Sequence, residues 1–270
     1  MKNILYCSKK LEKVASIRHS LLERRGFGDE DRFLYPGFAA EDDYPYLSMM
    51  VEPSVDVKLV HTNFNRDAHT VEALTEMGSN KRLLEGAEYL KGEGVESVMW
   101  TSTSASFTLG IEGVQEQIKV LEDALKVPAS TTAMAFIHAL DAMGSNRVAI
   151  AATYPKDIAQ LFKEFLESHG FEVVKYSSKG IITAAEVGTL RREDVIDFVT
   201  QYDTSNADTL LIPDTALHSA AWLEGLEDAV QKPVLTANQV SFWEALRIAG
   251  KLTNQTGFGE LFSRPISEDS

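Results

Sequence analysis

VMWTSTSASFTLG, residues 98–110, changes from a strand-like apolar run to a string of hydroxyl side chains and then to a helical pattern. A second change of the same kind occurs at residues 210–219, LLIPDTALHS, where the apolar run gives way to Pro213 and Asp214. In open α/β sheets, ligands bind beyond the carboxyl ends of the strands, which is where both polar clusters fall. We therefore expect a small acidic molecule to be held between these two strand tips.

Strands and helices alternate over most of the chain. Strands are expected at residues 33–35, 55–61, 95–100, 147–153, 171–176, 209–212 and 233–236. Helices are expected at residues 41–51, 81–92, 114–125, 132–143, 158–166, 192–202, 219–230 and 239–248, and the polar tail after Gly257 is expected to fray. This rhythm predicts an α/β fold with parallel sheets flanked by helices. Because the order of elements repeats, we expect two pseudo-symmetric Rossmann-like lobes with an active-site cleft between them.

The composition argues against several classes of function. The 270 residues carry a net charge of −14, from 40 acidic and 26 basic side chains, and nucleic-acid binding needs a basic surface. No apolar run approaches the roughly 20 residues that span a bilayer, so no membrane partner is expected. The one cysteine, Cys7, rules out an internal disulfide framework and a cysteine-based zinc site, which suits a cytoplasmic protein.

The N-terminal segment, residues 1–28, is expected to be a helical extension. It has too many charges and too short an apolar patch for a signal peptide, while Val14, Ile17, Leu21 and Leu22 recur at helical spacing. Such an amphipathic helix is expected to pack on the domain or on a second subunit. A homo-oligomer is therefore one interpretation.

The first strand tip offers five hydroxyls in six residues: Thr101, Ser102, Thr103, Ser104 and Ser106. Hydroxyls and free backbone N–H groups at the start of a helix can cradle an anion. The alternative for each of them is ordinary capping of the helix that follows. No G-x-S-x-G motif surrounds these serines, which argues against a hydrolase nucleophile.

The second strand tip places Asp214 and Thr215 after an apolar strand. A partly desolvated carboxyl group at Asp214 could work as an acid or a base, or it could cap the next helix. Tyr154 follows another strand and could donate its phenol to a carboxylate, although packing is the common role of such a residue. His218 is a minor candidate for the same cleft.

Cofactor and metal motifs are missing from the sequence. There is no G-x-G-x-x-G, no P-loop, and no His/Asp pattern at metal-ligand spacing, so we expect neither a cofactor nor a metal. A polar stretch at residues 62–70, TNFNRDAHT, is expected to cover a site.

At these tips the chain resembles the aspartate/glutamate racemase superfamily, in its maleate isomerase and arylmalonate decarboxylase branch. The resemblance covers roughly residues 32–250. The family's first tip reads Cys-Thr-Ser followed by Phe and Gly, and this chain has Ser102-Thr103-Ser104, Phe107 and Gly110. The segment from residue 128 to Pro155 is similar to the stretch before the family's Thr-Pro-Tyr strand end. KPVLTANQVSFWEALRIAG, residues 232–250, is similar to the family's C-terminal signature and is the most specific match.

The resemblance implies a cofactor-free enzyme of two lobes that acts on a small-molecule carboxylate. It also implies that hydroxyls and backbone amides bind one substrate carboxylate, here those of Thr103, Ser104, Tyr154 and Thr215. Such preorganised donors stabilise charge that develops in the transition state. By the same resemblance the C-terminal segment returns to the first lobe. The first lobe would then comprise residues 29–127 and 235–270, and the second lobe residues 128–234.

The chain departs from the family at both catalytic cysteines, because Ser102 and Asp214 occupy those positions. A serine without an adjacent base is a poor proton donor or nucleophile. Two-thiol racemisation is therefore not available, and isomerisation of maleate through a cysteine adduct is not expected. One-sided acid–base chemistry by Asp214 remains. It fits protonation of a carbanion after loss of CO2, with an apolar wall near Trp100, Phe107 or Trp222 expelling the leaving carboxylate.

The favoured hypothesis is therefore a cofactor-independent lyase that decarboxylates a malonate-type substrate. Isomerisation or hydration of a short dicarboxylate such as maleate is the nearest alternative. A protein that binds carboxylates without turnover is the rival from another class. A serine hydrolase that uses Ser102 with His218 and Asp214 is a further alternative, which depends on a triad geometry.

Overall fold

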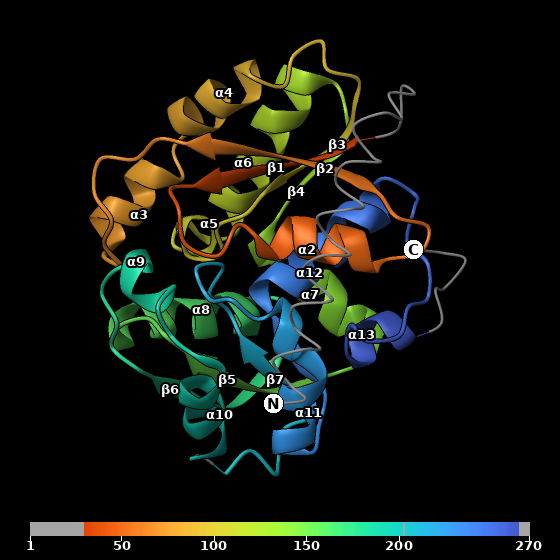
Figure 1. Ribbon diagram of the computed structural model, residues 1–270. Coiled ribbons are helices and arrows are strands. Elements are labelled where there is room, and N and C mark those ends of the chain that lie inside the picture. The colour runs from red at the N-terminus through yellow and green to blue at the C-terminus, as the bar shows by residue number, and fades with distance from the viewer. Residues whose placement is uncertain (1–29, 202, 265–270) are drawn as a thin grey trace, which may run out of the picture.

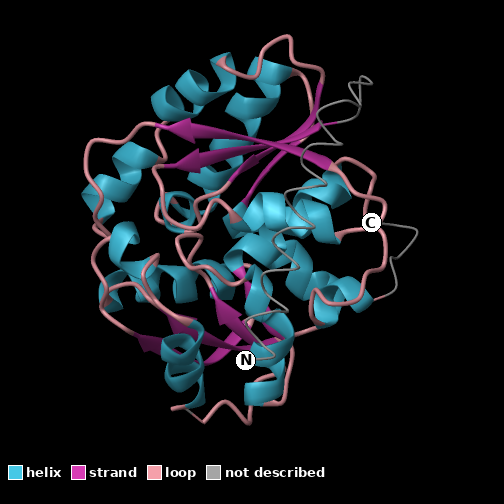
Figure 2. Cartoon of the chain, viewed as in Figure 1, coloured by secondary structure: helices cyan, strands magenta, loops and turns pink. Residues whose placement is uncertain are grey.

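The computed structural model describes residues 30–201 and 203–264, which form two four-stranded sheets that lie one above the other in Figure 1. The first sheet has the order β2-β1-β3-β4, with β1 Glu30–Pro36, β2 Asp56–Thr62, β3 Val95–Trp100 and β4 Ala129–Thr131. The second has the order β6-β5-β7-β8, with β5 Arg147–Ala152, β6 Glu172–Ser178, β7 Thr209–Ile212 and β8 Val234–Thr236. Neighbouring strands run parallel in both sheets, and helices cover them (Figure 2), so the predicted α/β fold of two lobes is confirmed.

The strands that lead to the two polar tips are buried on both faces. The last four residues of β3 and the whole of β7 are shielded from solvent. Helices on both faces of a parallel sheet exclude water, so its strands are continuously apolar rather than alternating. Polar groups can then follow only where the chain leaves the sheet at its carboxyl end.

Helices cover both faces of the first sheet (Figure 1). On the outer face lie α4 (Asn80–Glu88) and α6 (Gly110–Leu125), which also pack on each other. On the face toward the second sheet lie α2 (Asp43–Met50) and α12 (Ala237–Ile248). Short helices α3 (Val71–Met77) and α5 (Ser104–Phe107) follow the strands at the cleft.

Three helices accompany the second sheet: α8 (Lys156–Ser168), α10 (Arg192–Thr200) and α11 (Leu223–Val230). Two short elements lie between them, the helix α9 (Ala184–Val187) and the 3₁₀ turn η1 (Ala220–Trp222). The predicted helix at residues 219–230 is therefore a 3₁₀ turn followed by an α-helix. Between β6 and α9, the backbone carbonyls of Ile181 and Ile182 contact His69, which follows β2 of the first sheet.

A pair of equivalent units relates the two lobes. β4 runs directly into α7 (Thr132–Met143), and β8 runs directly into α12. In each case a threonine is the N-cap: Thr131 Oγ1 accepts from Met134 N at 3.2 Å, and Thr236 forms a capping box with Gln239. The two helices pack against each other at the centre of the molecule, which is the repeat that the order of elements predicted.

The observed strands differ slightly from the expected lobe boundaries. β4 belongs to the first sheet, although the expected boundary falls at residues 127/128, and β8 belongs to the second sheet, although the expected boundary falls at 234/235. The sequence analysis expected β8 at residues 233–236 but missed β4, because a strand of three residues carries no periodic signal. After β8 the chain returns to the first sheet, where α12 contacts β1, β3 and β4.

An aromatic core joins the two lobes. Phe162 of α8 lies 5.1 Å from Phe107 of α5 and 5.5 Å from Phe136 of α7, measured between ring centroids. All three rings are buried in one apolar cluster that includes residues of both sheets. A large apolar contact of this kind holds two lobes in a fixed relation, whereas polar contacts permit domain movement.

The expectation of a frayed tail is wrong for the residues that the structure describes. Phe258, Leu261 and Phe262 are buried, and α13 (Glu260–Ser263) packs on α7. Glu227 fixes this segment by accepting from Glu260 N at 3.0 Å. The sequence pattern failed because the three apolar side chains are scattered among polar ones. The predicted N-terminal helix of residues 1–28 lies outside the described residues.

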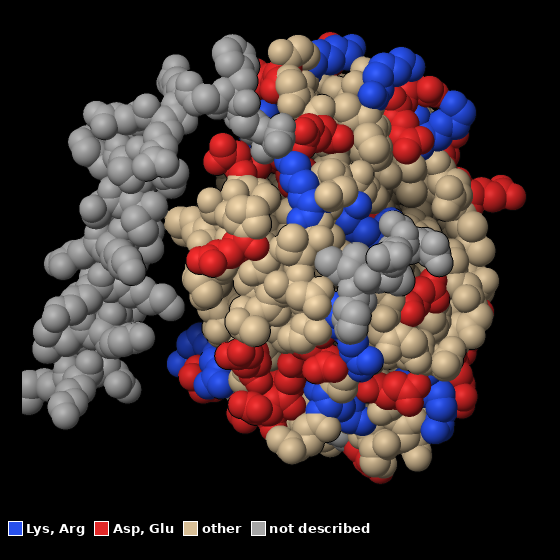
Figure 3. All heavy atoms as spheres, turned by 90° about the vertical axis from the view of Figure 1, so that its right-hand side faces the viewer, with Lys and Arg blue, Asp and Glu red and all other residues tan. Residues whose placement is uncertain are grey.

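The surface mixes both signs of charge. Figure 3 shows Lys and Arg side chains interspersed with Asp and Glu over the face that it presents. No broad basic field of the kind that phosphate backbones require covers this face. Within residues 30–201 and 203–264, no helix has the length and apolar character needed to cross a membrane.

Candidate active site

The first strand tip folds back on its own sheet before α5 begins. Thr101 Oγ1 donates to Leu34 O at 2.7 Å, which fixes the end of β3 beside β1. Ser102 Oγ accepts from Ala105 N, in the first turn of α5, at 3.3 Å, whereas the N-cap residue Thr103 makes no side-chain cap bond. Ser102 therefore supports the start of the helix, and its side chain also lines a pocket.

Gln117 and Gly78 together position α5 behind this tip. Gln117 Nε2 donates to Gly78 O at 2.8 Å and to Ala105 O at 2.9 Å, so it ties α6 to α3 and α5. A Cβ added at Gly78 would lie 2.0 Å from Ala105 O, closer than real atoms approach. Only glycine allows the backbones of α3 and α5 to come this close.

The second strand tip holds the Asp214 carboxylate at both oxygens. Thr153 Oγ1, which follows β5, donates to Oδ2, and Ala216 N donates to Oδ1 at 3.0 Å. The backbone contact turns the chain two residues after Asp214, as an Asx turn does. The carboxylate is 4% exposed and faces the cleft, so it is both a turn residue and a candidate for chemistry.

Tyr154 lies directly behind the pocket. Its phenol donates to Pro213 O, so it supports the peptide that precedes Asp214. Burial raises the pKa of Tyr154 well above its ordinary value, the negative charge of Asp214 adds to this, and the hydroxyls of Thr103 and Ser104 oppose it. The phenol therefore keeps its proton at neutral pH and acts as a hydrogen-bond donor.

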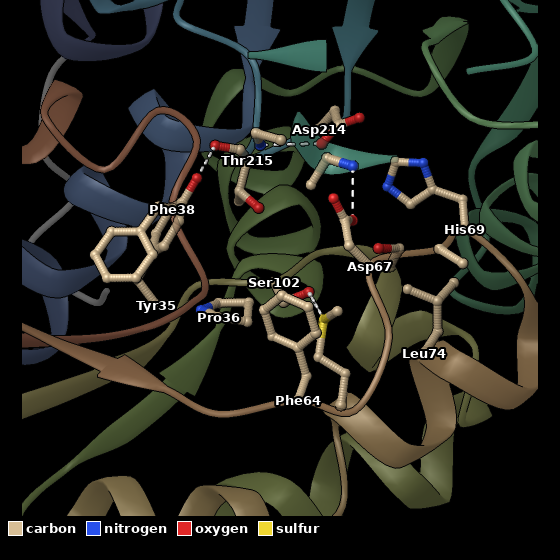
Figure 4. Close-up of a pocket in the computed structure, with 15 residues that line it drawn as sticks. Tyr35, Pro36, Phe38, Phe64, Asp67, His69, Leu74, Ser102, Asp214 and Thr215 are labelled. Carbon is tan, nitrogen blue, oxygen red and sulfur yellow. Dashed lines mark hydrogen bonds between the residues drawn. The ribbon is translucent and has the colours of Figure 1, made fainter. Parts of the chain in front are cut away.

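Both tips open into one pocket (Figure 4). Tyr35, Pro36, Ser102 and Ser104 come from the end of the first sheet. Asp214, Thr215 and Ala216 come from the end of the second. The remaining lining residues belong to the loops and to α3 and α9: Phe38, Phe64, Asp67, Ala68, His69, Leu74, Met77 and Ala184. The interlobe cleft predicted from the two strand tips is therefore present.

The structure brings together most of the predicted site residues. Ser102, Ser104, Asp214 and Thr215 line the pocket, while the Thr103 and Tyr154 side chains lie buried next to it. His218 does not line it: its Nε2 lies 2.9 Å from Asp42 Oδ1, and its side chain is 33% exposed. We therefore leave His218 out of the candidate site. The Ser-His-Asp arrangement of the hydrolase alternative is not assembled.

The pocket offers no cationic side chain to an anionic ligand. None of its lining residues is Lys or Arg, and two of them, Asp67 and Asp214, are carboxylates. Asp67 accepts from Ala184 N at 2.8 Å and from Ala185 N at 3.1 Å, so the start of α9 partly satisfies it. Hydroxyls and backbone N–H groups are the donors that remain. Among the residues with described positions, no group of three or more His, Cys, Asp or Glu could hold a metal ion.

A model of the arylmalonate decarboxylase family matches residues 61–262 of the chain. The chain belongs to this family. Within it, the arylmalonate decarboxylase of Bordetella bronchiseptica is 25% identical over 183 residues, which are 67% of this chain and 76% of that protein. The maleate isomerase of Alcaligenes faecalis is 24% identical over 148 residues, which are 54% of this chain and 58% of that protein. Both named relatives are enzymes.

Solved structures share the fold. The maleate isomerase Iso of Pseudomonas putida S16 superimposes with a TM-score of 0.78 at 20% identity, over 87% of this chain and 98% of that one. A crystal structure of arylmalonate decarboxylase gives a TM-score of 0.70 at 21% identity, over 87% and 100% of the two chains. The predicted fold of two parallel α/β lobes is therefore confirmed, and these solved structures share it.

In this family member, the apolar wall of the pocket comes from residues that the sequence analysis did not single out. Phe38, Phe64, Leu74 and Met77 line the pocket, whereas Trp100 and Phe107 are buried in the core and Trp222 lies elsewhere. The expectation failed because strand and helix residues next to the tips point into the core. The loops after β1 and β2 supply Phe38 and Phe64, and helix α3 supplies Leu74 and Met77.

Tyr35 is a further pocket residue that the sequence analysis missed. Its phenol donates to Thr215 O at 2.9 Å and accepts from Ala40 N at 3.0 Å, so it links the tips of both sheets. Burial raises the pKa of Tyr35 well above its ordinary value, so the phenol stays protonated. The sequence signal that could have identified Tyr35 is its position at the end of β1. It lies one residue beyond Leu34, which pairs with Trp100 of β3 in the sheet.

Tyr35→Phe should lower kcat/KM about tenfold and the free energy of unfolding by about 1–2 kcal/mol. The change leaves a buried carbonyl and a buried N–H without this partner, and it releases the peptide after Asp214. Steady-state kinetics and denaturant unfolding measure the two effects. Tyr89→Phe is the control, because Tyr89 is 69% exposed. Equal kinetics for Tyr35→Phe and wild type would show that the tips are held by other contacts.

Proposed function

We propose that this protein is a cofactor-independent lyase that decarboxylates a small malonate-type acid through an enediolate, with Asp214 as the proton donor. The observation that carries the proposal is that the Asp214 carboxyl group and the hydroxyls of Ser102 and Ser104 line one pocket from opposite lobes. Membership of a family that includes arylmalonate decarboxylase and maleate isomerase supports the substrate class.

The pocket has the parts that such a reaction needs. One substrate carboxylate accepts hydrogen bonds from the hydroxyl and backbone donors at Thr103, Ser104 and Thr215. The other carboxylate lies beside the apolar wall, where poor solvation favours its loss as CO2. As the C–C bond breaks, its electron pair passes into the enediolate, which the donors stabilise. Asp214 in its acid form then gives its proton to the α-carbon and is reprotonated afterwards.

Ser102 is proposed as a binding and orienting residue rather than a nucleophile. Its Oγ accepts from Ala105 N and donates to Met77 Sδ at 3.9 Å, so its proton is not directed at a base. A serine nucleophile needs a base that receives this proton. The hydroxyl can still donate to a substrate oxygen.

Two further functions fit the same pocket. Isomerisation or hydration of a short dicarboxylate such as maleate is the first, supported by the maleate isomerase relatives. Isomerisation through a cysteine adduct is not open to this chain, because Ser102 and Asp214 stand at the positions of the family thiols. Binding of a carboxylate without turnover is the second, supported by the loss of those thiols.

Proton NMR in D2O with a panel of substituted malonates and short dicarboxylates tests the proposal. We expect loss of a malonate with one deuterium incorporated at the α-carbon of the product. Hydration or isomerisation would instead give new signals from maleate, with or without deuterium. Line broadening of the ligands without turnover across the panel would favour the binding protein and contradict the lyase.

A further inference from the structure

His69 is a buried histidine of the pocket whose chemistry the proposed function leaves unused. It comes from the polar stretch at residues 62–70, is 6% exposed, and lines the pocket with Ser102 and Asp214. Two contacts with the second lobe hold it. Its backbone N–H donates to Ile182 O at 2.6 Å, and its Nδ1 lies 3.0 Å from Ile181 O.

The contact of Nδ1 fixes the tautomer of the ring. A backbone carbonyl can only accept, so Nδ1 must carry the proton that it donates to Ile181 O. In the neutral ring, Nε2 then has a free lone pair. Figure 4 shows the His69 ring with its other nitrogen directed toward the interior of the pocket, on the side of Asp67 and Asp214.

The surroundings hold the ring in this orientation. The Tyr154 ring meets it edge to face, with centroids 4.9 Å apart at an interplanar angle of 74°. The charged and titratable groups around it are Asp67, from its own loop, Asp214, from the second strand tip, and the Tyr154 phenol. A histidine held at Nδ1 by a carbonyl and open at Nε2 is the arrangement of a general base.

The proposed reaction leaves a task for such a group. Each turnover removes the proton of Asp214, and neither Lys nor Arg lines the pocket to return it. His69 is the lining side chain that can gain and lose a proton at a nitrogen atom.

We propose that His69 is a second acid–base residue of this site, with Nε2 as its reacting atom. The inference rests on the proposed function. The C–C bond breaks, CO2 leaves, and the electron pair enters the enediolate. Asp214 gives its proton to the α-carbon, and the His69 imidazolium then returns a proton from Nε2 to Asp214 by way of water. The neutral His69 ring takes up the next proton from solvent at Nε2, so each turnover moves one solvent proton to the α-carbon.

His69→Asn tests the inference in the full-length protein. The asparagine amide can still donate to Ile181 O but has no group at the position of Nε2. We expect kcat to fall about 10²–10⁴-fold, the range for loss of a general acid or base. The Kd of an unreactive substituted succinate should stay within about threefold, and Tm should be unchanged. His169→Asn is the matched control, because His169 makes the same Nδ1 contact with a carbonyl, 2.8 Å from Phe165 O, outside the pocket.

Nitrogen NMR of histidine-labelled protein gives a readout that does not depend on turnover. We expect a proton on Nδ1 of His69, none on Nε2 in the neutral ring, and a shift of the Nε2 signal when the succinate binds. Wild-type kcat in His69→Asn, a proton on Nε2 in place of Nδ1, or an Nε2 signal that ignores the ligand would each overturn the inference. A wild-type protein that turns over none of the panel would overturn the proposed lyase instead, and the ring nitrogens would then decide the role of His69.

Discussion

Asp214→Asn is expected to lower kcat about 10³-fold or more while the affinity for a carboxylate ligand changes little. The amide has nearly the shape of the carboxyl group, can still accept from Ala216 N, and leaves the hydroxyl and backbone donors of the pocket in place. It cannot deliver a proton to the α-carbon, and loss of a positioned acid costs a factor of about 10²–10⁴. Single-turnover rates, together with ligand Kd from calorimetry, separate chemistry from binding.

Asp208→Asn is the matched control for this variant. Asp208 accepts from Asn146 N and Arg147 N at the start of β5, so the same chemical change is made at the end of the sheet away from the pocket. It should retain wild-type kcat. If Asp214→Asn retains full activity too, Asp214 is a turn residue and the proton must come from another group.

Glu244→Gln is expected to lower the free energy of unfolding by about 3 kcal/mol at pH 7. Glu244 of α12 is fully buried, and its carboxylate accepts from Ser130 Oγ at 2.8 Å and from Arg247 Nε at 2.7 Å. His138 Nδ1 of α7 lies 2.8 Å from the same carboxylate. Removing one partner of a buried ion pair leaves the other groups without compensation, which costs several kcal/mol.

The pKa of Glu244 gives this contribution a definite pH dependence. Burial raises the pKa, but hydrogen bonds from His138 and Arg247 and their charges outweigh it and lower the pKa from 4.5 to about 2. A depressed pKa stabilises the folded state above the unfolded pKa, here above about pH 4.5. The stabilisation, about 3 kcal/mol, is lost as the pH falls toward 2.

Denaturant unfolding at several pH values measures both effects. The difference between wild type and Glu244→Gln should be largest above pH 5 and should shrink as the pH falls below 4.5. Glu172→Gln is the control, because Glu172 pairs with Arg147 on the surface, and an exposed pair contributes about 0–1 kcal/mol. A difference that does not change between pH 7 and pH 3 would show that the ionised form of Glu244 is not what stabilises α7 against α12.

The two predictions concern different parts of the same architecture. Asp214 lies at the cleft, where the ends of the two sheets meet, whereas Glu244 ties α12 to α7 and to β4 in the interior. We therefore expect the Glu244 variant to bind and turn over substrate normally at temperatures where it remains folded. The Asp214 variant should unfold close to the wild-type midpoint.

The sequence by itself determined the fold and the position of the cleft. Strand segments buried on both faces are apolar, so the runs 98–100 and 210–212 could be recognised locally, and the polar residues that follow them could be assigned to the carboxyl ends of parallel strands. That reasoning located Ser102, Ser104, Asp214 and Thr215, all of which line the pocket. These residues follow the last residue of their strands by two to four positions, so the strand fixes their place.

Only the tertiary structure decided which other side chains reach the pocket. Phe38 lies on a loop and Tyr35 enters through its contact with the opposite lobe, so no local pattern in the sequence marks them. The polar stretch 62–70 was expected to cover a site and does line the pocket, but its pattern did not show that His69 faces inward. His218 shows the converse, because it follows the second tip by four residues and yet pairs with Asp42 outside the pocket lining. The direction of a loop side chain depends on contacts between residues far apart in the chain. Here those contacts are made across the interface between the two lobes, which periodicity and spacing do not encode.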